Sequence, residues 1–166
     1  MKKNLRLRFG LLCFVLALSM AGAAQTGDKT ASKTIQSIVV VDFSGEATDE
    51  VSPGESWQFF GPTRQITVTE KQKIIGSGSA VFGTTSGTSR IAVSLCYLKK
   101  GSEVITSMAE NNHLIADADA ARRTFALSVS AQLPAGVYSV GYCVNNRGPQ
   151  TLNNNNYVNG WIMVIN

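Results

Sequence analysis

Short apolar runs, separated by turn residues, follow one another along most of the chain. They predict strands at 37–43, 56–60, 65–70, 73–82, 90–98, 103–107, 124–133, 137–144 and 159–165. The breaks between them contain Gly and Pro, as at Gly61-Pro62 and Pro134-Ala135-Gly136. No segment sustains a period of 3.6 residues, and the best helical candidate, 116–122, is long enough for only a turn or two.

Three of these strands alternate cleanly between two kinds of face. In 124–133 one face carries Phe125, Leu127, Val129, Ala131 and Leu133. In 90–98 and 137–144 large apolar residues share one face, and small residues, with Cys96 and Cys143 among them, share the other. One buried and one solvated face is typical of antiparallel sheets. We therefore predict an all-β, antiparallel β-sandwich of Greek-key, immunoglobulin-like or jelly-roll type, as a single domain over 37–166.

The first 24 residues have the pattern of a secretory signal peptide. Lys2, Lys3, Arg6 and Arg8 precede the apolar run 9–20, and small residues follow at 21–24. The run is shorter than the roughly 20 residues that a membrane-spanning helix needs, although a membrane anchor is the alternative. We expect a protein exported by a bacterium to the periplasm or the medium, with no membrane span in its mature form.

Removal of this segment changes the charge of the chain. It contains four of the 15 basic residues and none of the 11 acidic ones, so the remainder has no net charge. Its basic residues are scattered rather than clustered on one face, which argues against a nucleic-acid partner. Residues 25–36 are polar and predict a flexible leader.

Two cysteines remain in the expected mature chain. Cys13 lies in the signal segment, which leaves Cys96 and Cys143. In an exported domain such a pair most simply forms a disulfide, and two buried free thiols are the alternative. Because both cysteines share the small faces of their strands, we expect a disulfide on the outer face of a sheet, joining two adjacent strands.

The segment from Leu133 to Tyr138 resembles the tyrosine corner of Greek-key sandwiches. A strand ends at Leu133, Pro and Gly turn the chain, and Tyr138 enters the next strand. In such corners the Tyr hydroxyl bonds to upstream backbone. Gly136 would supply a positive φ or a close backbone approach. A plain hairpin with a core Tyr is the alternative.

The order of segments over 73–166 resembles bacterial pre-peptidase C-terminal domains. A Gly/Ser/Thr strand (IIGSGSAVFGTTSG) precedes an apolar strand (RIAVSLCYL), a polar loop, a long alternating strand, the pattern L-x-x-G-x-Y and a final strand (VNGWIMVIN). The resemblance implies a β-sandwich accessory module of a secreted enzyme, without catalysis of its own, although this chain shows no attached enzyme.

Residues for catalysis or metal binding are sparse. A Ser-His-Asp relay would have to use the single histidine, His113, which lies in a polar loop, and no G-x-S-x-G motif is present. Asp117 and Asp119 offer weak support for a calcium loop, and a solvated loop is favoured. Gly76 and Gly78 lie within an apparent strand and lack the Lys of a phosphate loop, which favours a bulge or close sheet packing. We expect no enzyme activity, cofactor or metal.

A polar and aromatic region remains before and within the last predicted strand. Asn153, Asn154, Asn155, Asn156 and Tyr157 are followed by Asn159 and Trp161. Amides bond sugar hydroxyls, and aromatic faces stack on the apolar faces of sugar rings. The alternative is that Asn tolerates turns and that Trp161, alternating with Met163 and Ile165, belongs to the core. We predict that any ligand contacts Asn153–Asn156 and Tyr157.

Two functions therefore compete. The first is a non-catalytic exported binding module, for a glycan or a cell-envelope protein. The second is a structural subunit of a surface or secretion assembly, which would need a donated strand or an exposed sheet edge; residues 25–36 could serve as the donated arm.

Overall fold

The computed structural model describes residues 38–54, 56–70 and 72–165, in which every regular element is a strand. The strands are β1 (Ile38–Glu46), β2 (Gln58–Val68), β3 (Gln72–Phe82), β4 (Ser89–Lys99), β5 (Thr106–Ser107), β6 (Leu114–Ala118), β7 (Arg123–Leu133), β8 (Gly136–Asn146) and β9 (Tyr157–Ile165). These ranges contain no helix able to cross a membrane. The expected signal peptide and leader lie outside the described residues.

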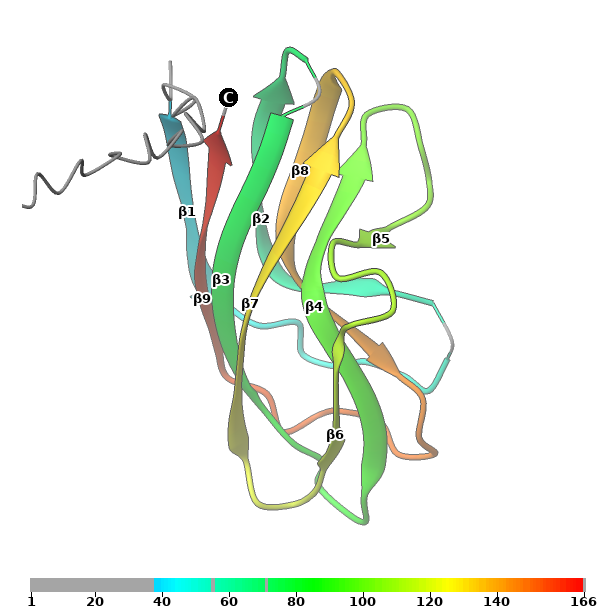
Figure 1. Ribbon diagram of the computed structural model, residues 1–166. Coiled ribbons are helices and arrows are strands. Elements are labelled where there is room, and N and C mark those ends of the chain that lie inside the picture. Colours follow the sequence, from blue (N-terminus) through cyan, green and yellow to red (C-terminus); the bar gives the residue numbers. More distant parts are fainter. Residues whose placement is uncertain (1–37, 55, 71, 166) are drawn as a thin grey trace, which may run out of the picture. The chain divides into compact units, whose positions relative to one another are not determined.

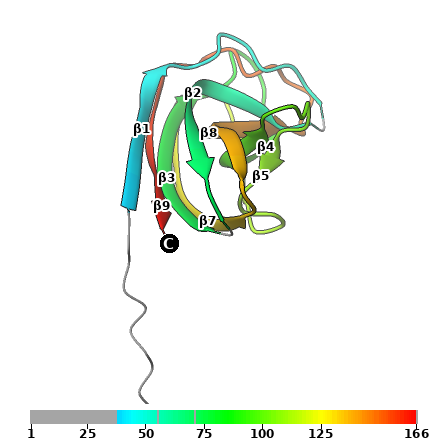
Figure 2. The same ribbon diagram turned by 90° about the horizontal axis from the view of Figure 1, so that it is seen from above.

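The strands form two antiparallel sheets packed face to face (Figures 1 and 2). Sheet 1 has the order β1-β9-β3-β7, and sheet 2 has the order β2-β8-β4-β5, with β6 also paired to β4. The chain passes from one sheet to the other at every connection except those that join β4, β5 and β6. This order, β1-β9-β3-β7 facing β2-β8-β4-β6, is that of a jelly roll. The predicted all-β sandwich is confirmed, and the strand order selects the jelly roll.

The core lies between the inner faces of the two sheets. Sheet 1 contributes Phe43, Ile74, Phe82, Phe125 and Ile162 among others, and sheet 2 contributes Phe60, Ile91, Leu95, Val140 and Tyr142. Phe82 stacks on Phe125 with ring centroids 4.5 Å apart. These alternating positions explain why the apolar runs of the sequence form strands, because each strand has one face to bury.

Gly76 and Gly78 bring the two sheets close together. Both lie on the inner face of β3, and a Cβ at Gly76 would lie 2.6 Å from Cδ1 of Leu95 on β4. A Cβ at Gly78 would lie 3.0 Å from the other methyl group of the same leucine. Their φ angles are not positive, so space rather than conformation requires glycine. Of the two expected roles, close sheet packing is the one found.

Three sequence predictions about the elements are wrong. Of the predicted strand 103–107 only the last two residues, β5, form a strand. Gly61-Pro62 does not end a strand, because it lies within β2, where the pairing with β8 shifts register between Phe59 and Thr63. A bulge tolerates Pro because its residues need not donate to the ladder. The helical candidate 116–122 begins instead within β6, whose pairing with β4 and the burial of Ala118 override its helical composition.

Candidate functional site

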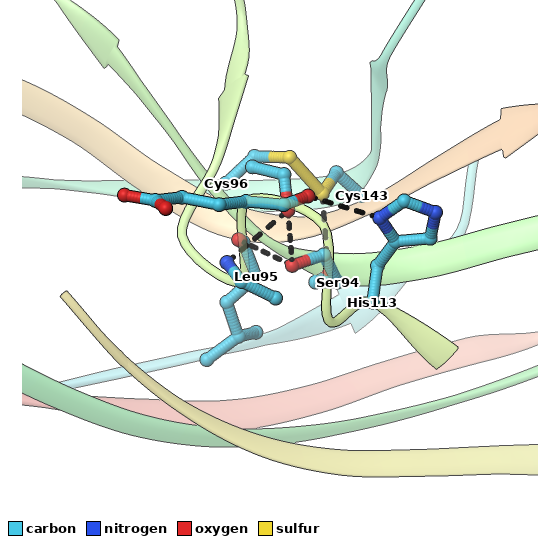
Figure 3. The surroundings of a disulfide bond; sticks show 8 residues. Ser94, Leu95, Cys96, His113 and Cys143 are labelled. Atoms are coloured by element: carbon cyan, nitrogen blue, oxygen red, sulfur yellow. Dashed lines mark hydrogen bonds between the residues drawn. A yellow bond between two sulfur atoms is a disulfide. The ribbon is translucent and has the colours of Figure 1, made fainter. Parts of the chain in front are cut away.

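Cys96 and Cys143 form the expected disulfide between adjacent strands. The S–S distance is 2.04 Å and the Cα–Cα distance is 5.7 Å, and the two strands, β4 and β8, pair directly (Figure 3). Both cysteines lie on the face of sheet 2 that points away from the core, since Leu95 and Tyr142 beside them belong to the core. The prediction of a disulfide on the outer face of a sheet is confirmed.

This outer face is not solvated, contrary to the expected pattern of one buried and one wet face. Ala92, Ser94, Cys96 and Cys143 are fully buried. The segment after β4 returns to them: Ser107 Oγ donates to Ser94 Oγ at 2.8 Å, and His113 lies beside the disulfide (Figure 3). The small side chains on the outer faces of β4 and β8 therefore leave room for the segment after β4, which packs over them as a covering layer.

His113 has structural contacts in this layer. Its ring lies edge-on to Trp57 with centroids 5.4 Å apart, and its Nδ1 is 3.0 Å from the carbonyl oxygen of Glu110. Asp119, one of the carboxylates considered for calcium, pairs with Arg123 at 2.7 Å. Among the described residues no group of three or more His, Cys, Asp or Glu side chains is placed to hold a metal ion.

The predicted corner has the expected hydrogen bond. Tyr138 Oη donates to the carbonyl oxygen of Pro134 at 2.9 Å. The preceding strand, β7, belongs to sheet 1 and β8 to sheet 2, so the connection is a corner between sheets and not a hairpin. Leu133 is buried at its start. Gly136 has no positive φ; instead a Cβ there would lie 3.1 Å from the Tyr138 ring, which corresponds to the expected close approach.

The run Asn153–Asn156 connects three other loops. Asn153 Oδ1 accepts from Thr85 N at 2.9 Å, and Asn154 Oδ1 accepts from Arg122 Nη2 at 2.6 Å. Asn155 Nδ2 donates to the carbonyl oxygens of Thr48, Asp49 and Leu152. At Asn156 the backbone carbonyl accepts from Ala47 N at 2.8 Å. The run therefore has a structural role that the sequence did not reveal, and its contact with a ligand stays a prediction.

Tyr157 and Trp161 lie on the outer face of β9. The buried residues of this strand are Val158, Gly160, Ile162 and Val164, so the intervening side chains point away from the core. Tyr157 is 47% exposed and Trp161 is 36% exposed, and they are the two aromatic residues among the large exposed hydrophobic side chains of the described chain. The interpretation of Trp161 as a core residue is wrong.

Polar residues lie beside these two rings and between them on the outer face of sheet 1, and beyond Trp161 this face continues with apolar Met163 and its partners Val40 and Ile75. Trp161 lies between Asp42 of β1 and Ser77 of β3. Two residues before Trp161 on the same face, Asn159 lies between Ser44 of β1 and Ser79 of β3. Tyr157, two residues earlier again, pairs with Glu46 of β1. We call this set the aromatic face; it comprises Asp42, Ser44, Glu46, Ser77, Ser79, Tyr157, Asn159 and Trp161. The members of the face other than the two rings supply hydroxyl, amide and carboxylate groups.

A groove of about 890 Å³ runs along the opposite edge of sheet 1. One wall is the end of β7, residues 127–132, and the other is formed by residues 108–115. Within the described part of the chain β7 pairs with β3 alone, so its second edge borders this β7 groove. Leu114 and Ile115 line it and are exposed, whereas Phe, Tyr and Trp are absent from its lining.

Comparisons with known proteins do not assign a family. No protein-family model and no curated protein matches the chain. Among solved structures, a capsid structure of infectious bursal disease virus, Gx strain, is 10% identical with a TM-score of 0.44, and the match covers 79% of this chain and 32% of that one. The C-terminal CBM6 of the laminarinase LamC from Zobellia galactanivorans is 12% identical with a TM-score of 0.29, over 78% of this chain and 100% of that one. The GH26-CBM35 mannanase of Podospora anserina is 15% identical with a TM-score of 0.29, and the match covers 74% of this chain and 27% of that one.

Most of the aromatic face was not predicted from the sequence. The β9 residues Tyr157, Asn159 and Trp161 were noticed, and Tyr157 was predicted to contact a ligand. The β1 and β3 residues beside them were not noticed, because only the pairing of β9 with both strands brings them together. Alternate residues of β9 point to opposite faces, and both faces carry apolar side chains. The face with the bulkier side chains, Trp161, Met163 and Ile165, is the outer one. Gly160 is the residue in the sequence that could have indicated which face of β9 is buried. A glycine that points inward leaves room for the Phe43 ring in the core.

Proposed function

We propose that this chain is an exported, non-catalytic module that binds a glycan on its aromatic face. The observation that carries the proposal is the placement of Tyr157 and Trp161 on one face of one strand, exposed, with Asn159 between them. Exposed apolar side chains that gather on one face mark an interaction site more often than singly scattered ones do. Sugar rings present apolar C–H faces to such rings and hydroxyl groups to the amides and carboxylates around them.

Two further features support the proposal. The disulfide Cys96–Cys143 is typical of proteins that fold in an oxidising compartment outside the cytosol. The face lies on regular strands rather than on loops, and rigid strands hold binding side chains in place before the ligand arrives, which lowers the entropy cost of binding.

The test measures binding of the purified exported protein to an array of plant, fungal and bacterial glycans. Trp161→Ala and Tyr157→Ala should each weaken binding about tenfold, the effect of losing roughly 1.4 kcal/mol of stacking. Val104→Ala is the matched control, because Val104 is the most exposed large hydrophobic residue in the described chain and lies outside the face. Unchanged binding by both aromatic variants would contradict the proposal.

The β7 groove favours a second candidate function, a subunit of an assembly held together by strand addition. An unpaired strand edge beside an open groove can accept an extended segment of another chain through backbone hydrogen bonds. This function predicts a size that grows with concentration in light scattering, and Ile115→Lys should reduce it because Ile115 lines the groove. A monomer at every concentration would contradict it.

A further inference from the structure

We propose that the ligand of the aromatic face is an extended polysaccharide chain that carries no anionic groups; this inference rests on the proposed glycan-binding function. It follows from two properties of the face, the separation of the two aromatic residues and the sign of the charges beside them.

The separation sets the length of the ligand. Tyr157 and Trp161 are four residues apart on one strand, which places their Cα atoms roughly 13 Å apart. A single sugar ring is about as wide as a tyrosine ring and cannot contact both. Asn159 lies midway on the same face, so a chain of several sugars running along β9 would meet an aromatic ring, an amide and a second ring in turn.

Both aromatic residues have a carboxylate as their cross-strand neighbour. Asp42 pairs with Trp161 and Glu46 pairs with Tyr157, and the Cβ atoms of such pairs lie about 5 Å apart. Both acidic residues are exposed. A carboxylate accepts hydrogen bonds from sugar hydroxyls but repels uronate or sulfate groups held at the same place.

The neighbours on the other side add no positive charge. Ser77 pairs with Trp161 and donates from Oγ to the Leu127 carbonyl at 3.1 Å, and Ser79 pairs with Asn159. Lys73 is on the same face of β3 but pairs with Ile165, two rungs beyond Trp161. Arg64 approaches from β2, where its Nε donates to the backbone carbonyl of Asp42 at 2.9 Å. Among the side chains that pair directly with the two rings, the charged ones are therefore the carboxylates of Asp42 and Glu46.

The experiment is calorimetric titration of the exported protein with saccharides of two to six units at low ionic strength. Neutral gluco-, manno- and xylo-oligosaccharides are compared with oligogalacturonate of equal length. We expect affinity to rise from disaccharide to hexasaccharide for the neutral chain that binds, and oligogalacturonate to bind at least about tenfold more weakly. In Asp42→Asn/Glu46→Gln this discrimination should shrink. The matched control, Glu103→Gln/Asp117→Asn, changes the net charge equally through exposed residues outside the face and should leave it unchanged.

The outcomes separate this inference from the function on which it rests. Oligogalacturonate binding as tightly as the neutral chains, or a disaccharide binding as tightly as a hexasaccharide, would overturn the inference while the glycan-binding function stood. Absence of binding to every glycan, on the array and in solution, would overturn the function itself.

Discussion

At the scale of single residues, two buried tyrosines of β8 act through their hydroxyl groups. Tyr138 Oη donates to Pro134 in the corner, and Tyr142 Oη donates to the Phe125 carbonyl in the opposite sheet at 3.0 Å. Both rings are buried, so each hydroxyl needs a partner inside the protein. Alternation in the sequence predicted that both rings are buried. Of the two hydrogen bonds, only that of the Tyr138 hydroxyl to upstream backbone was expected.

Tyr138→Phe should lower the free energy of unfolding by about 1–2 kcal/mol, because the Pro134 carbonyl loses its donor while the ring still fills its place. Denaturant titration of the variant and the wild type measures the difference. A change near zero would mean that the hydroxyl bond contributes nothing to the corner.

Tyr142→Phe should make stability less sensitive to alkali. Burial raises the pKa of Tyr142 above that of an unfolded tyrosine, about 10. Above that pH the unfolded chain loses a proton that the folded chain keeps, so the wild type should lose about 1.4 kcal/mol per pH unit through this residue. The variant lacks this loss, and its deficit relative to the wild type should therefore shrink between pH 9 and pH 11. A deficit independent of pH would contradict the assignment.

At the scale of elements, close packing and a covalent bond hold β3, β4 and β8 together. The glycines of β3 face Leu95 of β4, and the disulfide joins β4 to β8 on the other side of sheet 2. The strand β4 is thus held at both of its faces, by the glycines of β3 on the inner side and by the disulfide on the outer side. The sequence predicted the pairing of the cysteines, and for the two glycines it offered two alternatives, a bulge or close sheet packing, between which the structure decided.

Gly76→Ala should destabilise the fold by about 1–3 kcal/mol, since the added methyl group meets Leu95 and Ile162 in a filled core. Gly54→Ala is the matched control, because nothing lies within 4 Å of a Cβ at that position. Thermal and denaturant unfolding of both variants measure the two effects. Equal effects would show that the sheets tolerate a wider separation.

Removal of the disulfide by Cys96→Ala/Cys143→Ala should cost up to about 4 kcal/mol, the chain-entropy value for a sequence separation of 47 residues. Denaturant titration of the double variant is the measurement. In parallel, thiol labelling of the unreduced, denatured wild type should detect no thiol at either position, and two free thiols would contradict the bond.

At the scale of the whole molecule, the jelly roll presents two surfaces of different character. The aromatic face covers part of sheet 1, and the β7 groove lies along its edge. The two proposed functions assign a glycan to the first surface and an extended segment of a protein to the second. The resemblance to pre-peptidase C-terminal domains, with its implication of an accessory module, stays a prediction.

Deletion of residues 25–34, outside the described part of the chain, should leave the melting temperature within about 5 °C of the full exported protein, a shift on the order of 1 kcal/mol for a domain of this size. The reason is their polar composition, which offers little apolar surface to bury. Calorimetry measures the shift, and a larger decrease would show that this segment packs on the fold.

The sequence by itself determined the all-β fold class, and it favoured a disulfide over two free thiols and a corner at Tyr138 over a plain hairpin. Each depends on local spacing: alternation shows which residues share a face, and Pro and Gly show where the chain turns. Only the tertiary structure decided which face of β9 is buried, that β2 continues through Gly61-Pro62, and that 114–118 is a strand. Alternation shows which residues share a face of a strand, but it does not show which face packs against the opposite sheet. Where both faces carry apolar residues, the face that is buried depends on the side chains of the opposite sheet. Trp161 is therefore exposed beside Asp42, a neighbour more than a hundred residues away in the chain.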